Sequence, residues 1–256
     1  MPVYKCPRCG RTVVKPEGNY YCRVCGPDVL MERVSEGKER AEVSFEDVLY
    51  YEKLPDYRTV EEFFKEFTRP DKYAAFWSFV DRYAIYQFWN KEYIECLAGE
   101  IKRRVGSNLV LEVAAGDGML SYWLRKHGVN VKATDSGEWY DRVKRRAPVE
   151  IIDAVSAIKK YKPKMVIASW LPVGEPLDIE IFNVCAEMRV PYIILIGETD
   201  GACGSLRFWE EKYWRRVGYE EEYLNRCDEY NLCRTDYYAG VWFRHSSTIL
   251  FVLKQK

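Results

Sequence analysis

Four cysteines near the start of the chain have the spacing of metal ligands. Two Cys-x-x-Cys pairs are separated by twelve residues, and each pair is followed by a glycine. Such pairs turn their thiolates toward one tetrahedral ion, and glycine permits the tight backbone that the turn requires. We expect a structural zinc site, with an unligated reduced set or a redox pair as the alternatives. The expected ligands are Cys6, Cys9, Cys22 and Cys25.

A second group combines acids with a run of small residues. An acid followed by small residues lets the backbone approach a ligand closely, and a helix beginning just beyond them offers free N–H groups. An acid at the end of the next strand can accept two ribose hydroxyls, and one at the end of the third can accept the exocyclic amine of adenine. In chain order the residues are Glu112, Ala114, Gly116, Gly118, Asp135 and Asp153.

These residues lie in an alternation of strands and helices that begins near residue 106. The pattern predicts strands over 109–114, 129–134, 149–152, 165–168 and 192–196, with helices over 119–126, 139–145, 154–161 and 179–188 between them. Such repetition indicates an α/β fold with a doubly wound, mostly parallel sheet. Such sheets bind ligands at the carboxyl ends of their strands. The last apolar segments, 241–243 and 248–253, predict a closing antiparallel hairpin.

The cysteine-rich segment resembles the zinc-ribbon family. Residues 11–21, between the two pairs, predict a small hairpin that joins them. The resemblance implies a separate unit over 1–29, which a metal would stabilise because so short a segment has little core. A nucleic-acid role for this ribbon is an alternative to a purely structural one.

The domain over 106–256 resembles class I S-adenosylmethionine-dependent methyltransferases. The family's first motif is acid-x-Gly-x-Gly-x-Gly, and Ala114 stands where its first glycine is usual. The resemblance implies that Glu112, Ala114, Gly116 and Gly118 line the methionine end of the cofactor, with Asp135 on the ribose and Asp153 near the adenine. A nicotinamide enzyme is the chief rival, but the Gly-x-Gly-x-x-Gly register is missing.

Two loops after the predicted fourth and fifth strands are candidates for the chemistry. Ser169-Trp-Leu-Pro172 stands where N-methyltransferases of the family often have Asn/Asp-Pro-Pro-aromatic, and this departure argues against an adenine or amide nitrogen as acceptor. Ser169 is expected at the cofactor, and Trp170 is expected to stack on a substrate, with a plug over the sheet as the alternative. Glu198 and Asp200 are candidate bases, although an acidic glycine-rich loop is as often a turn.

An aromatic-rich segment, 30–105, separates the two resemblances. It holds 16 of the 39 aromatic residues between Phe45 and Tyr93. Thr59-Val-Glu-Glu62 predicts a capping box with a helix from Val60, and a second helix is expected from about Asp71. We expect these helices to pack on the following domain, with a lid that contacts a planar substrate as the alternative.

Composition limits the remaining possibilities. The formal net charge is zero, which argues against binding by non-specific phosphate attraction. No apolar run is long enough to span a membrane, and no secretory signal is visible, so we expect a cytoplasmic chain with reduced or metal-bound cysteines. Two glutamines among abundant Lys, Arg and Glu suggest a thermophilic protein. The basic run 142–146 is expected at the edge of the sheet opposite the site.

The sequence therefore favours a methyltransferase whose acceptor is a macromolecule, either RNA or protein. A non-catalytic methyltransferase-like partner is the alternative, motivated by the irregular residues 169–172. A nucleic-acid-binding module built on the ribbon, with the sheet as scaffold, is a third reading. None of these readings involves a membrane, and the sequence does not set the oligomeric state.

Overall fold

The computed structural model describes residues 2–15, 18–36, 43–199, 202–238, 241–243 and 245–254. The chain divides into two compact units, Met1–Ser44 and Phe45–Lys256. None of the described helices is both long and apolar enough to cross a membrane.

The first unit is a three-stranded antiparallel sheet that carries the four cysteines. Its strands are β1 (Pro2–Lys5), β2 (Thr12–Val14) and β3 (Glu32–Glu36), in the order β2-β1-β3. The small core contains Tyr4, Val29 and Met31 beside two of the cysteines. A core of this size stabilises a fold only weakly.

The hairpin predicted over 11–21 is wrong in its pairing. Thr12–Val14 pairs with the strand before the first Cys-x-x-Cys, and Tyr21 forms a bridge with Leu30 after the second. Each cysteine pair therefore lies in its own hairpin. The two turns are alike, because the amides of Gly10 and Gly26 each donate to the carbonyl of the first cysteine of their pair at 3.0 Å.

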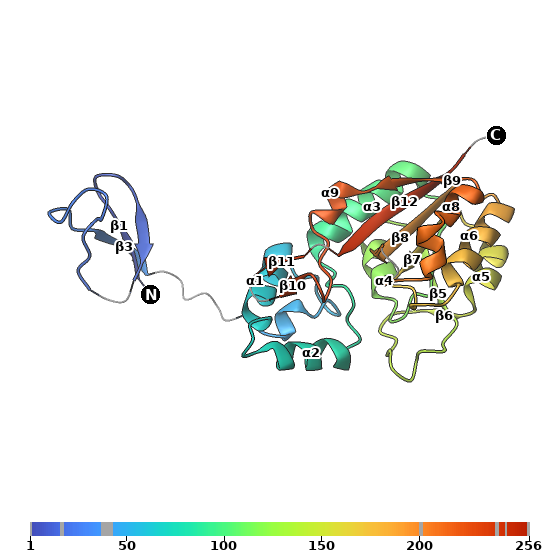
Figure 1. Ribbon diagram of the computed structural model, residues 1–256, viewed down its shortest axis with the longest axis horizontal. Helices are drawn as coiled ribbons and strands as arrows, with labels where there is room; N and C mark the ends of the chain where they lie inside the picture. The colour runs from blue at the N-terminus through green and yellow to red at the C-terminus, as the bar shows by residue number, and fades with distance from the viewer. Residues whose placement is uncertain are drawn as a thin grey trace. The chain divides into compact units, whose positions relative to one another are not determined.

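The second unit is built on a seven-stranded mixed sheet (Figure 1). Its parallel part, which confirms the predicted doubly wound sheet, contains β4 (Val110–Val113), β5 (Val131–Asp135), β6 (Glu150–Ile151), β7 (Met165–Ser169) and β8 (Tyr192–Glu198). Two antiparallel strands, β9 (Tyr219–Tyr223) and β12 (Ser246–Leu253), complete it. The strand order is β6-β5-β4-β7-β8-β12-β9.

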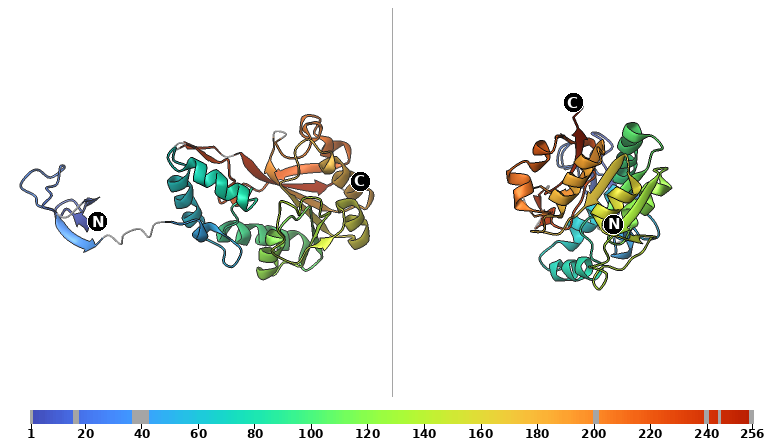
Figure 2. Two further views of the ribbon diagram at one scale, coloured as in Figure 1. Left: turned by 90° about the horizontal axis from the view of Figure 1, so that it is seen from below. Right: turned by 90° about the vertical axis from the view of Figure 1, so that its right-hand side faces the viewer.

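Helices cover both faces of this sheet (Figure 2). One face packs on α5 (Ala154–Tyr161), α6 (Leu177–Glu187), α7 (Leu206–Glu210) and α8 (Tyr213–Arg216) through alternate strand residues such as Leu111, Val166 and Ile193. The other carries α3 (Lys91–Val105), α4 (Met119–Lys126) and the short α9 (Asn225–Asp228). Burial on both faces explains why the central strands β7 and β8 are almost continuously apolar.

The order of the strands reverses between β4 and β7. From β4 the chain runs outward through β5 to β6, and it then returns to the other side of β4 to form β7 and β8. In open α/β sheets a crevice forms at the carboxyl ends of the strands where the order reverses. The residues that follow β4, β5 and β7 therefore meet at one edge.

An aromatic subdomain precedes the sheet. It contains the short 3₁₀ turn η1 (Glu46–Val48), α1 (Tyr57–Phe67) and α2 (Tyr73–Arg82), joined by the small hairpin of β10 (Tyr237–Tyr238) and β11 (Val241–Trp242). Its core consists largely of phenylalanine side chains, five of which are buried. The buried rings are Phe63, Phe64, Phe76, Phe79 and Phe88.

Three predicted elements are wrong in detail. The first helix begins at Tyr57 rather than Val60, because the carboxylate of Asp56, not Thr59, caps it by accepting the Thr59 amide at 2.8 Å. Ile249–Leu253 pair with Tyr219–Tyr223, whereas 241–242 pair with 237–238, so the predicted pairing of 241–243 with 248–253 is wrong. No helix forms over 139–145.

The expectation that no cysteine is oxidised is also wrong. Cys96 in α3 and Cys227 in α9 form a disulfide, with their Cα atoms 5.4 Å apart. The two residues are 131 positions apart, so no spacing in the sequence indicates the pair. The bond ties α9, and the loop that follows it, to the helix that covers the sheet.

Reduction of this disulfide is expected to lower the free energy of unfolding of the second unit by about 2–5 kcal/mol, because it closes a long loop in the unfolded chain. The measurement is denaturant unfolding followed by tryptophan fluorescence, with and without a phosphine reductant. All eight tryptophans lie in the second unit, so tryptophan fluorescence reports the unfolding of that unit and not of the cysteine-rich unit.

Cys227→Ser is the matched control. It should have the stability of the reduced wild type and should not respond to the reductant. An unchanged wild-type midpoint under reduction would contradict the prediction.

Candidate functional site

The turn between β4 and α4 is left-handed at three alternate positions. Ala114, Gly116 and Gly118 have φ angles of 50°, 52° and 79°. A Cβ at Gly118 would lie 2.6 Å from Cγ2 of Val149, so only glycine fits there. Ala114 adopts a left-handed conformation that glycine adopts more readily, at a cost of about 1–2 kcal/mol. Strain of this kind persists where the surrounding structure holds it.

Asp135 joins this turn to the end of β5. Its Oδ2 accepts the amide of Gly116 at 2.9 Å, and its Oδ1 accepts the amide of Gly137 at 2.8 Å. The side chain is 7% exposed. A carboxylate offers about four acceptor positions, so two remain after these bonds. Asp135 is therefore able to accept two further donors at the strand edge.

Two more acids lie close to the turn, Glu112 buried and Asp117 half-buried. Glu112 in β4 accepts the amide of Ser121 in α4 at 3.0 Å, and burial raises its pKa to about 8. Burial also raises the pKa of Asp117 to about 6, against the amide of Met119 and the charge of Arg146, which lower it. Buried acids without a bound cation hold protons near neutral pH.

Tyr140, which the sequence reasoning missed, carries an unpartnered hydroxyl. Its Oη is buried and has no hydrogen-bond partner among the residues that the structure describes. Burial, followed by the charge of Asp135, raises the pKa of Tyr140 to about 12. An orphaned buried hydroxyl beside three acids indicates a place where a polar ligand belongs.

The segment that contains Tyr140 folds onto the glycine turn. The amides of Arg146 and Ala147 donate to the carbonyl of Asp117 at 2.9 and 3.1 Å. The basic run 142–146 therefore lies on the site's edge of the sheet, and the prediction that placed it at the opposite edge is wrong. That prediction depended on the helix that does not form.

The other predicted cofactor residues lie further along the same edge. Asp153 is exposed and caps α5 by accepting the amide of Ser156 at 2.9 Å. Ser169 is half-buried and ends β7. Their contacts to a ligand stay a prediction.

Trp170, directly after β7, is strained. Its φ angle is 55°, which is rare for a bulky residue. Its indole Nε1 donates to Oε1 of Gln87 at 3.0 Å, and its ring stacks on Tyr86 with centroids 5.8 Å apart. Gln87 is buried and in turn bonds to Asn231. The indole is therefore fixed from two sides.

Gln87 and Asn231 were also missed by the sequence reasoning. A buried amide that holds another side chain has no local motif, and its partners come from segments 144 positions apart. The only feature of the sequence that could have drawn attention to Gln87 is that the chain has just two glutamines.

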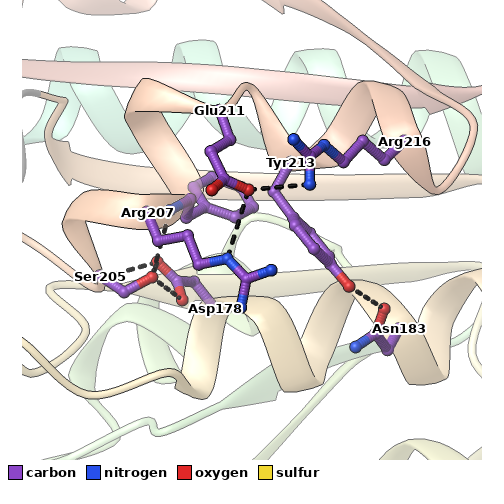
Figure 3. A network of polar contacts seen from close by, with 8 residues as sticks. Asp178, Asn183, Ser205, Arg207, Glu211, Tyr213 and Arg216 are labelled. Atoms are coloured by element: carbon purple, nitrogen blue, oxygen red, sulfur yellow. Dashed lines mark hydrogen bonds and ion pairs between the residues drawn. The ribbon is translucent and has the colours of Figure 1, made fainter.

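The loop after β8 is anchored from α6. Asp178 is buried, and its carboxylate accepts the amide of Ser205 at 2.7 Å and the Ser205 hydroxyl at 2.9 Å (Figure 3). Cys203 is 7% exposed, and its Sγ packs where a Cβ at Gly197 would lie, so this cysteine fills space in the loop. These contacts shape a small cavity at the ends of β7 and β8.

One predicted base can be placed and one cannot. Glu198 ends β8, is half-buried, and accepts the hydroxyl of Thr235 at 2.8 Å. Asp200 lies outside the described residues. Their roles stay predictions.

The four cysteines of the first unit come together as predicted. Their four sulfur atoms all lie within 4.8 Å of one another. The sulfurs of Cys6 and Cys25 are 3.8 Å apart, and those of Cys9 and Cys22 are 3.7 Å apart. Zinc–sulfur bonds of about 2.3 Å at tetrahedral angles separate neighbouring sulfurs by about 3.8 Å. The donor set and its spacing therefore fit zinc.

No protein-family model and no curated protein matches the chain. In fold it is similar to several solved methyltransferases. Magnesium protoporphyrin IX methyltransferase from Synechocystis PCC 6803, solved with bound SAM, has a TM-score of 0.42 at 16% identity, over 63% of this chain and 78% of that one. The CcbJ methyltransferase from Streptomyces caelestis gives 0.45 at 9%, over 64% and 91%. The glycopeptide N-methyltransferase MtfA gives 0.41 at 14%, over 63% and 90%. These likenesses concern the fold alone.

Glu112 is expected to make stability fall as pH rises. Its folded pKa of about 8 lies above its ordinary value of 4.5, so between these values the folded state binds more protons than the unfolded state. Stability is then highest at the acidic end and is lost toward pH 8, by about 2 kcal/mol between pH 6 and pH 8.

The measurement is denaturant unfolding at pH 6, 7 and 8 for the wild type and Glu112→Gln. The variant should lose this part of the slope, because its amide does not titrate. Glu95→Gln, an exposed change in α3, should follow the wild type. If the free energy of unfolding depended on pH in the same way for the wild type and Glu112→Gln, the raised pKa of Glu112 would be refuted.

Proposed function

We propose that the chain is an S-adenosylmethionine-dependent methyltransferase. The observation that carries the proposal is the Asp135 carboxylate, which holds the Gly116 turn at the reversal of strand order and keeps acceptor positions free. A nucleoside ligand at such an edge presents two ribose hydroxyls, which a carboxylate accepts together. The strained Ala114 is explained by the same requirement for a left-handed turn.

The chemistry of the buried groups fits this cofactor. S-adenosylmethionine carries a positive sulfonium and an ammonium group, and Glu112, Asp117 and Asp135 supply carboxyl groups close to the glycine turn. The orphaned hydroxyl of Tyr140 supplies a further polar contact. Glycine at 116 leaves the backbone open, because a Cβ there would meet only Val143 within 4 Å, at 3.7 Å.

Different residues of the chain have different roles in methyl transfer. When bound, the cofactor supplies an electrophilic methyl group. Asp135 holds the ribose and Glu112 fixes the start of α4, so that the glycine turn keeps its shape. Trp170 orients the acceptor at the end of β7, and Glu198 receives a proton where the acceptor atom carries one. Positioning supplies most of the acceleration in an in-line displacement.

Calorimetric titration with S-adenosylmethionine tests the proposal. The wild type should bind at micromolar levels, and Asp135→Ala should weaken binding at least about 100-fold, because it removes a charge-assisted pair of bonds together with the brace of the turn. Asp141→Ala, an exposed acid in the segment after β5, is the control and should bind like the wild type.

Absence of heat with the wild type at millimolar cofactor would overturn the proposal. Binding without transfer of labelled methyl groups to any RNA, protein or small-molecule pool would instead favour a non-catalytic methyltransferase-like partner. The irregular Ser169-Trp170 sequence is the feature that favours this second candidate.

We further propose that the first unit holds one structural zinc ion. Two matching hairpin turns present the four sulfurs at tetrahedral spacing. Elemental analysis should find one zinc per chain in the wild type and none in Cys22→Ser. Chelation should unfold the first unit, because metal affinity supplies most of its folding free energy.

The readout is proteolysis within residues 1–44 with and without chelator, with tryptophan fluorescence of the second unit as an internal control. Protection of the first unit that survives complete removal of the metal would contradict a zinc-dependent fold.

A further inference from the structure

Arginine side chains stack on aromatic rings around the edge of the sheet where β4, β5 and β7 end. The guanidinium of Arg146 lies 3.6 Å from the ring centroid of Tyr51 and 5.7 Å from that of Tyr83, and Arg82 lies 5.6 Å from Tyr83. Tyr51 also donates its hydroxyl to the carbonyl of Tyr83 at 3.4 Å. These side chains form one continuous group beside the glycine turn.

The same pairing continues in both directions. In the segment after β5, Arg142 lies 5.3 Å from Trp139, and Arg145 lies 5.0 Å from Tyr140. Toward β7, Arg234 lies 4.2 Å from the centroid of Tyr86.

Arg234 is also 5.6 Å from Trp77, and Tyr86 stacks on Trp170. We call this set the arginine–aromatic surface. Its members are Tyr51, Trp77, Arg82, Tyr83, Tyr86, Trp139, Tyr140, Arg142, Arg145, Arg146, Trp170 and Arg234.

Backbone contacts hold the two halves of this surface at one edge. Segment 86–88 forms a bridge with 232–234, because Arg234 donates its amide to the carbonyl of Tyr86 at 3.1 Å and Phe88 donates to Leu232 at 2.9 Å. The bonds from Arg146 and Ala147 to the Asp117 carbonyl place the other half on the glycine turn. The arrangement is thus fixed by main-chain hydrogen bonds rather than by the side chains alone.

Stacking leaves these arginines able to bind anions. An arginine on a ring uses its flat face, and its N–H groups still point outward in the plane of the guanidinium. Among the described residues, Arg82, Arg145 and Arg146 form no ion pair with a carboxylate. Arg142 and Arg234 have exposed partners, Asp141 at 3.8 Å and Asp81 at 3.5 Å. Arg82, Arg145 and Arg146 are therefore available to pair with the phosphates of a ligand.

Trp170 is the inner end of the surface. Of the described rings, Tyr86 alone stacks on it, and its indole is fixed by Gln87 in a strained backbone conformation. A planar group that reached the end of β7 would meet this ring. Aromatic faces bind the bases of single strands by stacking, while arginines bind the intervening phosphates.

We propose that the arginine–aromatic surface binds single-stranded nucleic acid and places one base on Trp170, which makes such a strand the acceptor of the proposed methyltransferase. In the transfer, a lone pair of the base forms the bond to the methyl carbon, and the carbon–sulfur bond breaks with its electrons on sulfur. Any proton on the acceptor atom passes to Glu198 or to solvent. The acceptor assignment rests on the proposed function, whereas binding of the strand does not.

Fluorescence anisotropy tests the binding without cofactor. Full-length, zinc-loaded protein is titrated into a labelled 12-nucleotide RNA of mixed sequence, the matching DNA, and the RNA duplex. Micromolar binding of a single strand is expected, with weaker binding of the duplex, and the RNA and DNA arms identify the source of the strand. No binding of either strand at low salt, or equal binding of the duplex, would overturn the proposal.

Two double variants separate the surface from general charge. Arg82→Gln with Arg145→Gln should weaken single-strand binding about 10-fold and reduce the salt slope by roughly 1.4, because each phosphate that is no longer neutralised lowers the slope by about 0.7. Arg103→Gln with Lys159→Gln, exposed cations at the ends of α3 and α5 on the opposite edge, should change the affinity less than about 2-fold. An equally large effect in both double variants would overturn the proposal.

Trp170 variants test the stacked base. Trp170→Ala should weaken binding about 10-fold, and Trp170→Phe should restore part of the affinity because it retains a ring. Equal affinity of all three proteins would overturn the placement of a base on this ring.

Calorimetry with S-adenosylmethionine on the wild type tests the proposed function separately. A failure to bind the cofactor can therefore be distinguished from a failure to bind a single strand. Labelled methyl groups that reach protein but neither strand would overturn the acceptor assignment.

Discussion

The candidate site depends on the two hydrogen bonds that the carboxylate of Asp135 accepts from backbone amides. Asp135 is the last residue of β5, and with one oxygen on each side it fixes the turn after β4 and the start of the segment after β5. Both turns would otherwise present unpaired amides at the edge of the sheet, and buried amides without partners are costly. The glycine turn and the arginine-bearing segment are thus positioned by one side chain.

The second half of the site is assembled from parts of the chain that are distant in sequence. Tyr86 and Gln87 follow α2, Trp170 follows β7, and Asn231 and Arg234 follow α9. Each contact between them is modest alone, but together they hold a tryptophan in a conformation that it would not adopt by itself. The aromatic subdomain therefore contributes in two ways: most of its phenylalanines form a core, whereas Tyr51, Tyr83 and Tyr86 lie beside the arginines at the edge of the sheet. The expectation that this segment forms a core and the alternative that it contacts a substrate concern different residues, and the substrate contact stays a prediction.

The parallel strands and the cysteine site were predictable because each has a strong local signal. Apolar runs mark β4, β7 and β8, acids or glycines follow β4, β5 and β8, and paired cysteines mark a metal site. The helix predicted over 139–145 was wrong although the composition of the segment suits a helix. The amides of Arg146 and Ala147 donate to the carbonyl of Asp117, and these bonds hold the segment in a non-helical conformation. The sequence could not predict the contact between Gln87 and Asn231 or the Cys96–Cys227 disulfide. In both cases single residues more than 100 positions apart meet in the fold, and one sequence contains no spacing that indicates such a pair.

The disulfide has a consequence for the covalent connectivity of the molecule. Residues 96 and 227 are the closing points of a ring of chain that contains β4 through β9, and therefore every parallel strand of the sheet. A single cut anywhere in that ring, including the loop between β8 and α7, leaves the two fragments joined through sulfur. While the bond is oxidised, a nicked molecule would migrate as one species in a denaturing gel and separate into two only after the thiols are reduced.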